Sequence, residues 1–219
     1  MKVLITGATG MVGLGVLYEC IEDSRVTEII LINRKPIKKT SKKIKEYLLK
    51  DFNKLSTLRK HFYDLDAVFH CMGISSIGVK EEQFKSITFD ITEALVDTVY
   101  SKSPQAVFNY VSGTGTDETE KGKIMWARVK GRTENYIINK GFKDSYMFRA
   151  GAIIPEKGIK SSTIWYNAIY IITRPFFPLM KRIPSITTTT KLGKAMINSV
   201  NVNQNLKRLE GNDINTLAK

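Results

Sequence analysis

The residues Lys2 to Gly13 read KVLITGATGMVG, and the rest of the chain is organised around them. The aliphatic run Val3-Leu4-Ile5 predicts a β-strand that leads directly into glycines at positions 7, 10 and 13. After the last glycine, the apolar residues Leu14, Leu17 and Ile21 recur at helical spacing. Strand, glycine turn and helix in this order predict a site for the pyrophosphate of a dinucleotide.

Each glycine of this stretch has its own expected task. Gly7 allows a sharp turn, Gly10 lets the backbone approach the pyrophosphate, and Gly13 lets the helix pack against the strand. The start of the helix adds unpaired N–H groups and the positive end of the helix dipole. The alternative is a tight strand-to-helix turn that binds no ligand.

Length and composition are those of an ordinary globular protein. The 219 residues suit one α/β domain and can bury a core without disulfides or a metal. Cys20 and Cys71 have no partner spacing, and His61 and His70 add no metal-ligand pattern. The apolar run before Gly7 is too short for a signal peptide. We therefore expect a reduced, cytoplasmic protein with no metal site.

The formal net charge is +13, which favours anionic partners such as phosphorylated cofactors, nucleic acid or acidic membranes. Eleven Lys or Arg residues fall between Arg34 and Lys60, against only Glu46 and Asp51. Most of these lysines are explained by a solvated basic face. Because no recognition motif accompanies the charge, we expect no specific binding of nucleic acid.

Strands and helices alternate along the chain. Strands are predicted at 27–32, 44–49, 66–71, 105–111 and 144–148, and helices at 54–62, 82–100 and 120–139. This alternation predicts a Rossmann-type α/β fold with a doubly wound parallel sheet, in a single domain that spans residues 1–219.

The pattern changes after Pro155, and residues 156–219 are expected to form a cleft wall or lid and the C-terminal elements. The run Ile164 to Met180 is strongly apolar but contains an arginine and two prolines, so it predicts a helix and turn over the sheet edge and not a membrane span. Thr187 to Thr190 is expected to cap a helix that reaches about Val200. The tail from Leu209 predicts an edge strand and a helical turn.

The end of the second predicted strand bears on the choice of cofactor. It reads Asn33-Arg34-Lys35, where units that prefer NAD carry an acidic residue for the ribose hydroxyls. Arg34 can bind a 2′-phosphate bidentately, whereas an acid would repel it. The sequence thus favours NADP over NAD, unless Arg34 and Lys35 belong only to the basic face. The fourth strand ends in Cys71-Met72-Gly73, at the sheet edge where ligands bind.

The segment TGATGMVG resembles the TGxxGxxG turn of the extended and atypical short-chain dehydrogenase/reductases. The resemblance implies that Asp51 and Phe52, after the third strand, flank the adenine. Together, the turn, the strand ends and the resemblance give the expected cofactor contacts: Gly7, Thr9, Gly10, Met11, Val12, Gly13, Asn33, Arg34, Lys35, Asp51, Phe52, Cys71, Met72, Gly73 and Lys130.

The same resemblance implies catalytic positions. In that superfamily a serine follows the fifth strand, and a Tyr-x-x-x-Lys pair lies on the next helix, with the tyrosine as general acid or base. Here Ser112 and Lys130 occupy the serine and lysine positions, and Trp126 stands at the tyrosine position. An indole N–H is only a donor and does not titrate usefully, so Trp126 cannot transfer the proton. It is expected either to pack in the core or to wall the pocket.

Other side chains are weaker candidates for the missing acid. Tyr110, Tyr136 and Tyr166 carry hydroxyl groups, and Tyr166 lies in the expected lid. His70, inside the fourth strand, is better explained as a buried neutral histidine with a backbone partner.

Further motifs make the resemblance closer. CMG, YVSGTGTD, WARVKGRTEN, MFRAG and TTTT resemble a bacterial group of uncharacterised NAD-dependent epimerase/dehydratase-like proteins over nearly the whole chain. A more distant resemblance is to the Tat-interacting oxidoreductase type. These motifs are specific for the fold and the cofactor and do not specify the reaction.

Two functions of different classes follow. The first is an NADP-dependent oxidoreductase of small molecules with a non-standard site, because a flavin- or quinone-like acceptor can take its proton from solvent. The second is a non-catalytic NADP-binding protein that senses the cofactor or docks a partner, which the Trp126 change favours. The substrate and the oligomeric state, a homodimer included, stay open.

Overall fold

The computed structural model describes residues 1–160, 175, 177–203 and 205–219. The bounds of its helices and strands are β1 Lys2–Thr6, α1 Met11–Glu22, β2 Glu28–Asn33, β3 Ile44–Leu48, η1 Phe52–His61, β4 Ala67–His70, α2 Glu81–Lys85, η2 Ser86–Asp90, α3 Ile91–Tyr100, β5 Val107–Val111, α4 Met125–Asn139, β6 Asp144–Arg149, β7 Ile153–Ile154, α6 Phe177–Met180, β8 Thr187–Thr188, α7 Thr189–Ser199, β9 Arg208–Glu210 and α8 Gly211–Leu217.

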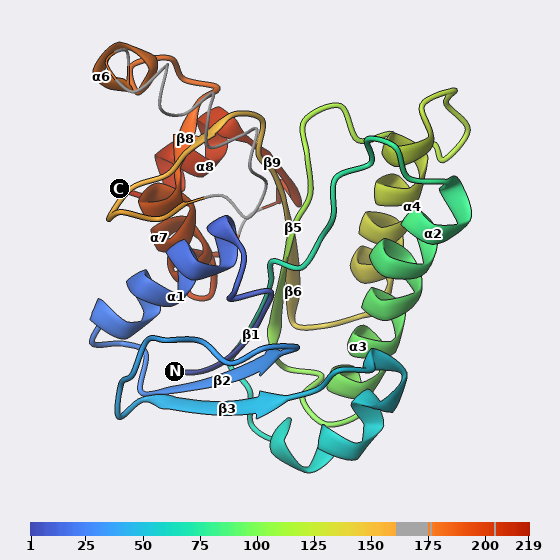
Figure 1. The fold of residues 1–219 in the computed structure, drawn as a ribbon, viewed down its shortest axis with the longest axis vertical. Helices are drawn as coiled ribbons and strands as arrows, with labels where there is room; N and C mark the ends of the chain where they lie inside the picture. The colour runs from blue at the N-terminus through green and yellow to red at the C-terminus, as the bar shows by residue number, and fades with distance from the viewer. Residues whose placement is uncertain (161–174, 176, 204) are drawn as a thin grey trace.

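A seven-stranded sheet in the order β3-β2-β1-β4-β5-β6-β9 forms the centre of the molecule, and every pair in it is parallel. Helices α1, α7 and α8 cover one face, and η1, α3 and α4 cover the other (Figure 1). Buried side chains alternate between the two faces: Val3 and Ile5 belong to the core under α1, and Leu4 to the core under α3. The predicted doubly wound α/β fold is confirmed.

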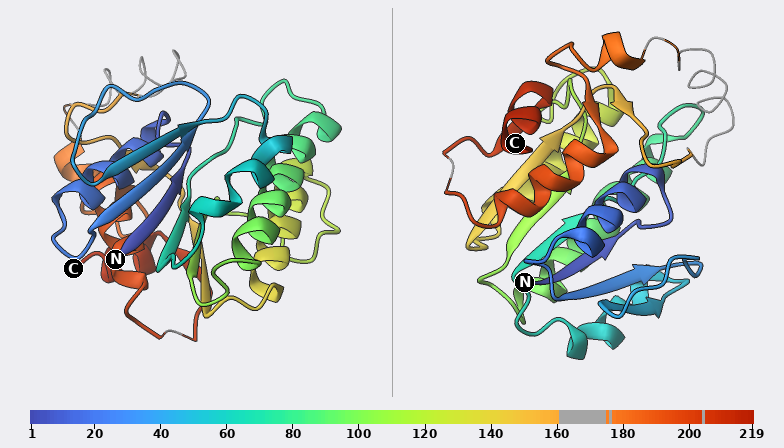
Figure 2. Two further views of the ribbon diagram at one scale, coloured as in Figure 1. Left: turned by 90° about the horizontal axis from the view of Figure 1, so that it is seen from below. Right: turned by 90° about the vertical axis from the view of Figure 1, so that its left-hand side faces the viewer.

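The C-terminal segment completes the fold (Figure 2). Helix α7 packs along α1, and β9 joins the sheet beside β6 at its edge. Thr188 caps α7, because its side-chain oxygen accepts the N–H of Lys191 at 3.1 Å. The predicted threonine cap and the edge strand with its helical turn are therefore confirmed.

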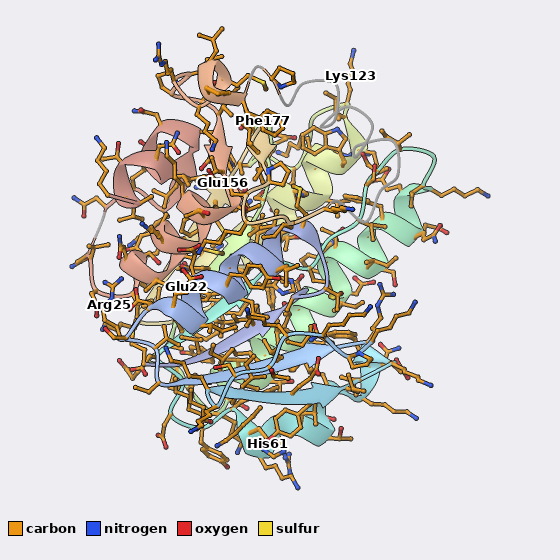
Figure 3. All side chains as sticks on the ribbon, turned by 60° about the vertical axis from the view of Figure 1, so that its left-hand side comes forward. Glu22, Arg25, His61, Lys123, Glu156 and Phe177 are labelled. Carbon is orange, nitrogen blue, oxygen red and sulfur yellow. The ribbon has the colours of Figure 1, made fainter. Side chains whose placement is uncertain are left out.

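One addition to the fold was not predicted. Strands β7 and β8 form a separate two-stranded parallel sheet. Glu156, just after β7 (Figure 3), donates its backbone N–H to Oγ1 of Thr189, the first residue of α7, at 3.0 Å. Its carboxylate pairs with Lys181, which follows α6. Of the expected lid Ile164 to Met180, only Pro175 and Phe177–Met180 lie inside the described residues.

Several predicted boundaries need correction. The helix expected from Glu120 begins at Met125, because the Asp117 carboxylate binds the N–H groups of Thr119 and Gly122 in a loop before it, and Glu120 has a positive φ of 62°. The helix expected at 54–62 is a 3₁₀ helix that begins at Phe52. The long helix predicted over 82–100 contains the π-helical turn η2 between α2 and α3.

Candidate cofactor and catalytic site

A cleft of about 700 Å³ opens at the carboxyl edge of the sheet. The loops that follow β1, β2, β3 and β4, four adjacent strands, line it. Doubly wound sheets bind their ligands at this edge, where the strand order reverses, which here is between β1 and β4. The lining residues are Gly7, Thr9, Gly10, Ile32, Asn33, Arg34, Lys35, Lys50, Phe52, Cys71, Met72 and Gly73.

Most of the predicted cofactor contacts are gathered at this cleft, namely Gly7, Thr9, Gly10, Asn33, Arg34, Lys35, Phe52, Cys71, Met72 and Gly73. Met11, Val12 and Gly13 form the first turn of α1, and they, Asp51 and Lys130 are not among the lining residues. The Asp51 carboxylate instead caps η1, where it accepts the N–H of Asn53 at 3.0 Å. Ile32 and Lys50 were not predicted. The available signal for Lys50 was its position immediately before Asp51-Phe52.

The glycine turn has the geometry of a phosphate cradle. Gly7 has φ of +76°, and a Cβ built on it would lie 2.7 Å from the backbone of Cys71, so only glycine fits there. A Cβ on Gly13 would lie 2.2 Å from the Gly7 carbonyl oxygen, which shows that the turn itself also requires this glycine. A Cβ on Gly10 would meet only that oxygen, at 3.4 Å. The space beyond Gly10 thus belongs to the cleft.

The start of α1 is left open toward the cleft. Gly10 is the N-cap residue of this helix and supplies no side-chain hydrogen bond. The first N–H groups of a helix have no intrahelical acceptor, so those of Met11 and Val12 are available to an anion.

Three cations line the cleft. Arg34 and Lys35 follow β2, Lys50 follows β3, and all three are exposed. None of them has an ion-pair or hydrogen-bond partner among the described residues, and no lining residue is acidic. Like charges held together at one cleft repel one another unless an anion joins them. The arrangement therefore suits a polyanionic ligand.

The catalytic positions lie at the next strand end, after β5. Ser112 is buried, and its Oγ lies 3.0 Å from Oγ1 of Thr116. Because the Thr116 hydroxyl donates to the Gly113 carbonyl at 2.7 Å, the Ser112 hydroxyl is the donor of the pair. In this arrangement the Ser112 hydroxyl proton is already donated to Thr116.

Trp126 and Lys130 lie one helical turn apart on α4 and meet the turn after β5. A Cβ built on Gly113 would lie 3.9 Å from both Cζ3 of Trp126 and Nζ of Lys130. Trp126 is half-buried and packs on the small cluster of Phe84, Phe89 and Val129. Burial lowers the pKa of Lys130 to about 8, and the nearby Glu134 carboxylate opposes the fall.

The two candidate tyrosines that the structure describes, Tyr110 and Tyr136, are not placed to act as the missing acid. Tyr110 is fully buried, stacks on His70 and has its pKa raised by burial. The Tyr136 hydroxyl donates to the Asp97 carboxylate at 2.5 Å, and burial likewise raises its pKa. Tyr166 lies outside the described residues.

His70 is buried and neutral as predicted, but its partners are side chains and not backbone. The Thr92 hydroxyl donates to the Thr88 carbonyl at 2.6 Å and therefore accepts from Nε2 of His70 at 2.9 Å. Nδ1 then accepts from the Thr6 hydroxyl at 2.6 Å. Burial lowers the pKa of His70 to about 3, so both hydroxyl groups face an uncharged ring.

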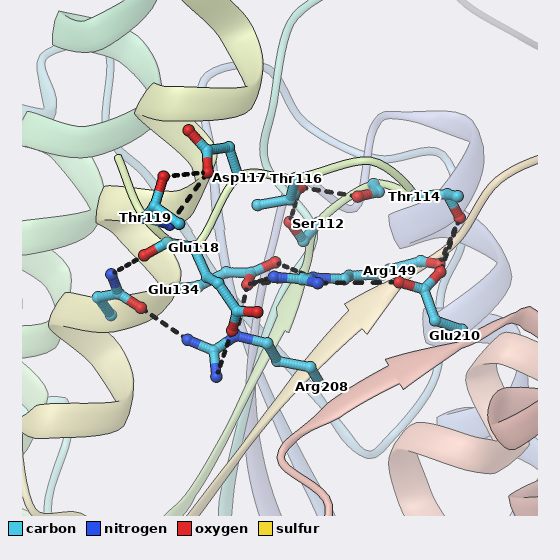
Figure 4. Close-up of polar contacts among 12 residues, drawn as sticks. Ser112, Thr114, Thr116, Asp117, Glu118, Thr119, Glu134, Arg149, Arg208 and Glu210 are labelled. Carbon is cyan, nitrogen blue, oxygen red and sulfur yellow. Dashed lines mark hydrogen bonds and ion pairs between the residues drawn. The ribbon is translucent and has the colours of Figure 1, made fainter. Parts of the chain in front are cut away.

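A buried ionic network supports the loop that carries Ser112 (Figure 4). Glu134 on α4 is completely buried and accepts Nε of Arg149 at 3.0 Å and its Nη2 at 2.7 Å. Arg208 on β9 also donates to Glu134, at 3.2 Å. Thr114, two residues after Ser112, donates to the Arg149 carbonyl or to Glu210, each at 3.0 Å. The network joins α4, β6, β9 and this loop.

Comparison with known proteins identifies the family. Residues 3–140 match the NAD dependent epimerase/dehydratase family. The chain belongs to this family. The predicted resemblance to NAD-dependent epimerase/dehydratase-like proteins is thereby confirmed.

Solved structures share the fold at low sequence identity. MoeE5 in complex with UDP-glucose and NAD has 12% identity and a TM-score of 0.70, with 100% of this chain and 81% of that one covered. The Bordetella bronchiseptica enzyme WbmH in complex with NAD+ has 15% identity and a TM-score of 0.70, with 95% and 75% covered. A short chain dehydrogenase family protein from Francisella tularensis has 13% identity and a TM-score of 0.66, with 97% and 98% covered.

Within 1–160, 175, 177–203 and 205–219, no helix combines the length and the apolar character that crossing a bilayer requires.

Proposed function

We propose that this protein is an NADP-dependent oxidoreductase with a non-standard site. The main observation behind the proposal is the cluster of Arg34, Lys35 and Lys50 at a cleft that the glycine turn also lines. The glycine turn and the open start of α1 suit the pyrophosphate of a nicotinamide dinucleotide. The structures of MoeE5 and WbmH that share this fold hold NAD, which supports this class of cofactor. The three cations, which have no partner among the described residues, are the reason to favour NADP.

The site residues have separate roles in this proposal. Phe52 and the Cys71-Met72-Gly73 turn contact the cofactor from the ends of β3 and β4. Lys130 makes no hydrogen bond or ion pair with the described residues, so it is available to the nicotinamide ribose. The cofactor supplies the hydride. Ser112 supports the turn through Thr116, and Trp126 packs beside this turn.

The discrimination between the two cofactors is expected to depend on Arg34. A bidentate contact of a guanidinium with the 2′-phosphate contributes about 1.5–3 kcal/mol, so Arg34→Ala is expected to lose about tenfold to a hundredfold of the preference for NADPH over NADH. The ratio of the two dissociation constants measures this. Arg59→Ala is the matched control, because Arg59 is exposed on η1, outside the cleft, and its loss changes the net charge equally. Equal ratios in the two variants would refute this role.

The non-catalytic alternative, an NADP-binding sensor or docking protein, is favoured by Trp126 and by the occupied Ser112 hydroxyl. Multiple-turnover oxidation of NADPH with a panel of quinones, flavins and carbonyls separates the two functions. Turnover with any acceptor supports the oxidoreductase. NADPH binding without turnover across the panel supports the alternative.

If the protein turns over, Trp126 is not expected to be the proton donor. Trp126→Phe is expected to keep the chemical step nearly intact, and both forms are expected to lose activity above about pH 8, where Lys130 loses its charge. Trp126→Tyr restores a group that Lys130 can activate across one helical turn, and weak carbonyl reduction is the expected gain. The pH dependence of NADPH oxidation is the measurement. A basic limb that is present in the unmodified enzyme and absent from a folded Trp126→Phe variant would show that Trp126 has another role.

A further inference from the structure

Glu46 on β3 holds both sides of the short loop that carries Arg34 and Lys35. One oxygen of its carboxylate, Oε1, accepts Nδ2 of Asn33 at 2.7 Å and the backbone N–H of Ile37 at 3.1 Å. Asn33 immediately precedes the two cations, and Ile37 follows them by two residues. A single acceptor on the neighbouring strand therefore closes this loop at both ends.

The same contact fixes the orientation of the Asn33 amide. Asn33 lines the cleft and is 3% exposed, and its Oδ1 has no hydrogen-bond partner among the described residues. A carboxylate only accepts hydrogen bonds, so a flipped amide would place Oδ1 against Glu46. Glu46 thus leaves a buried acceptor at the cleft wall. A ribose hydroxyl is a donor of the kind that this acceptor lacks.

We propose that Glu46 is a positioning residue for the NADP 2′-phosphate. By closing the loop from Asn33 to Ile37 it holds Arg34 and Lys35 at the cleft, and by orienting Asn33 it presents an uncharged acceptor to the adenosine ribose. The inference rests on the proposed function, because it concerns the same cofactor site. The two possible effects of Glu46 on NADP binding are opposite. An acid that acts only through its charge near the phosphate weakens binding, whereas an acid that positions the loop strengthens it.

Two substitutions separate position from charge. Glu46→Gln removes the charge and keeps an acceptor oxygen, whereas Glu46→Ala removes both. Glu46→Ala loses the hydrogen bonds to Asn33 and Ile37. Because such bonds are of ordinary strength, this variant is expected to bind NADPH about tenfold more weakly, with a smaller change for NADH. Glu46→Gln is expected to stay within about threefold of the unmodified protein. Glu28→Ala is the control, because Glu28 is an acid at the opposite end of β2 that pairs with Lys45.

Calorimetric titration of each folded variant with NADPH and with NADH decides the matter. Tighter NADPH binding in both Glu46 variants, or an unchanged NADPH-to-NADH ratio in Glu46→Ala, would overturn the inference. If Glu46→Ala does not fold, Glu46→Thr replaces it, since threonine suits a strand and is too short to reach both donors. Failure of the proposed function is distinct: the unmodified protein would then show no preference for NADPH.

Discussion

Gly10→Val is expected to keep the fold and to lose NADPH binding by about a hundredfold or more, equivalent to about 2.7 kcal/mol. Gly10 has extended backbone angles, φ −87° and ψ 164°, which a β-branched residue adopts readily. Its Cβ would meet only the Gly7 carbonyl oxygen, at 3.4 Å, so the larger part of the valine side chain enters the cleft. That is where a pyrophosphate would contact the turn and the first N–H groups of α1.

Calorimetry with NADPH, together with thermal unfolding followed by circular dichroism, measures this effect. Gly10→Ala is expected to give an intermediate affinity. Gly13→Ala provides the contrast: its Cβ would lie 2.2 Å from the same oxygen, so this variant is expected to lose stability instead. NADPH affinity that is unchanged in a folded Gly10→Val variant would place the cofactor elsewhere.

Glu134→Ala is expected to destabilise the fold by about 3–5 kcal/mol, because it leaves the guanidinium groups of Arg149 and Arg208 without their buried partner. Contacts of Arg149 with Glu210 and of Arg208 with Glu118 remain, which favours the lower end of this range. Glu118→Ala removes an acid from the same Arg208, but Glu118 is 56% exposed, so its loss is expected to cost less than about 1 kcal/mol. Urea unfolding of the two variants gives the comparison. Equal losses would mean that Glu134 is not the centre of the network.

The parts of the site that depend on short stretches of sequence could be predicted. Strand, turn and helix within Lys2 to Gly13 are specified by neighbouring residues, and the positive φ of Gly7 and the close approach to Gly13 follow from the same turn. Arg34 and Lys35 lie where the second strand was expected to end. The alternation of strands and helices then brings the strand ends to one edge of a parallel sheet.

The features that could not be predicted depend on strand register and on contacts between residues far apart in the sequence. Glu46 reaches Asn33 because β3 pairs with β2 in a particular register, which the sequence pattern of an edge strand specifies weakly. The Glu134 network joins residues that are far apart in sequence, and β7 and β8 are too short to show a period. The late start of α4 arises from the Asp117 loop, whose hydrogen bonds compete with the helix.

Titration of the unmodified protein with NADPH and NADH in parallel, at matched ionic strengths, is the most direct test of the proposed NADP site. The three cations at the glycine-turn cleft predict that NADPH binds about tenfold or more tightly than NADH, and that the difference shrinks as salt screens the 2′-phosphate. Equal affinities for the two cofactors, or a preference for NADH, would contradict the assignment of Arg34, Lys35 and Lys50 to this phosphate.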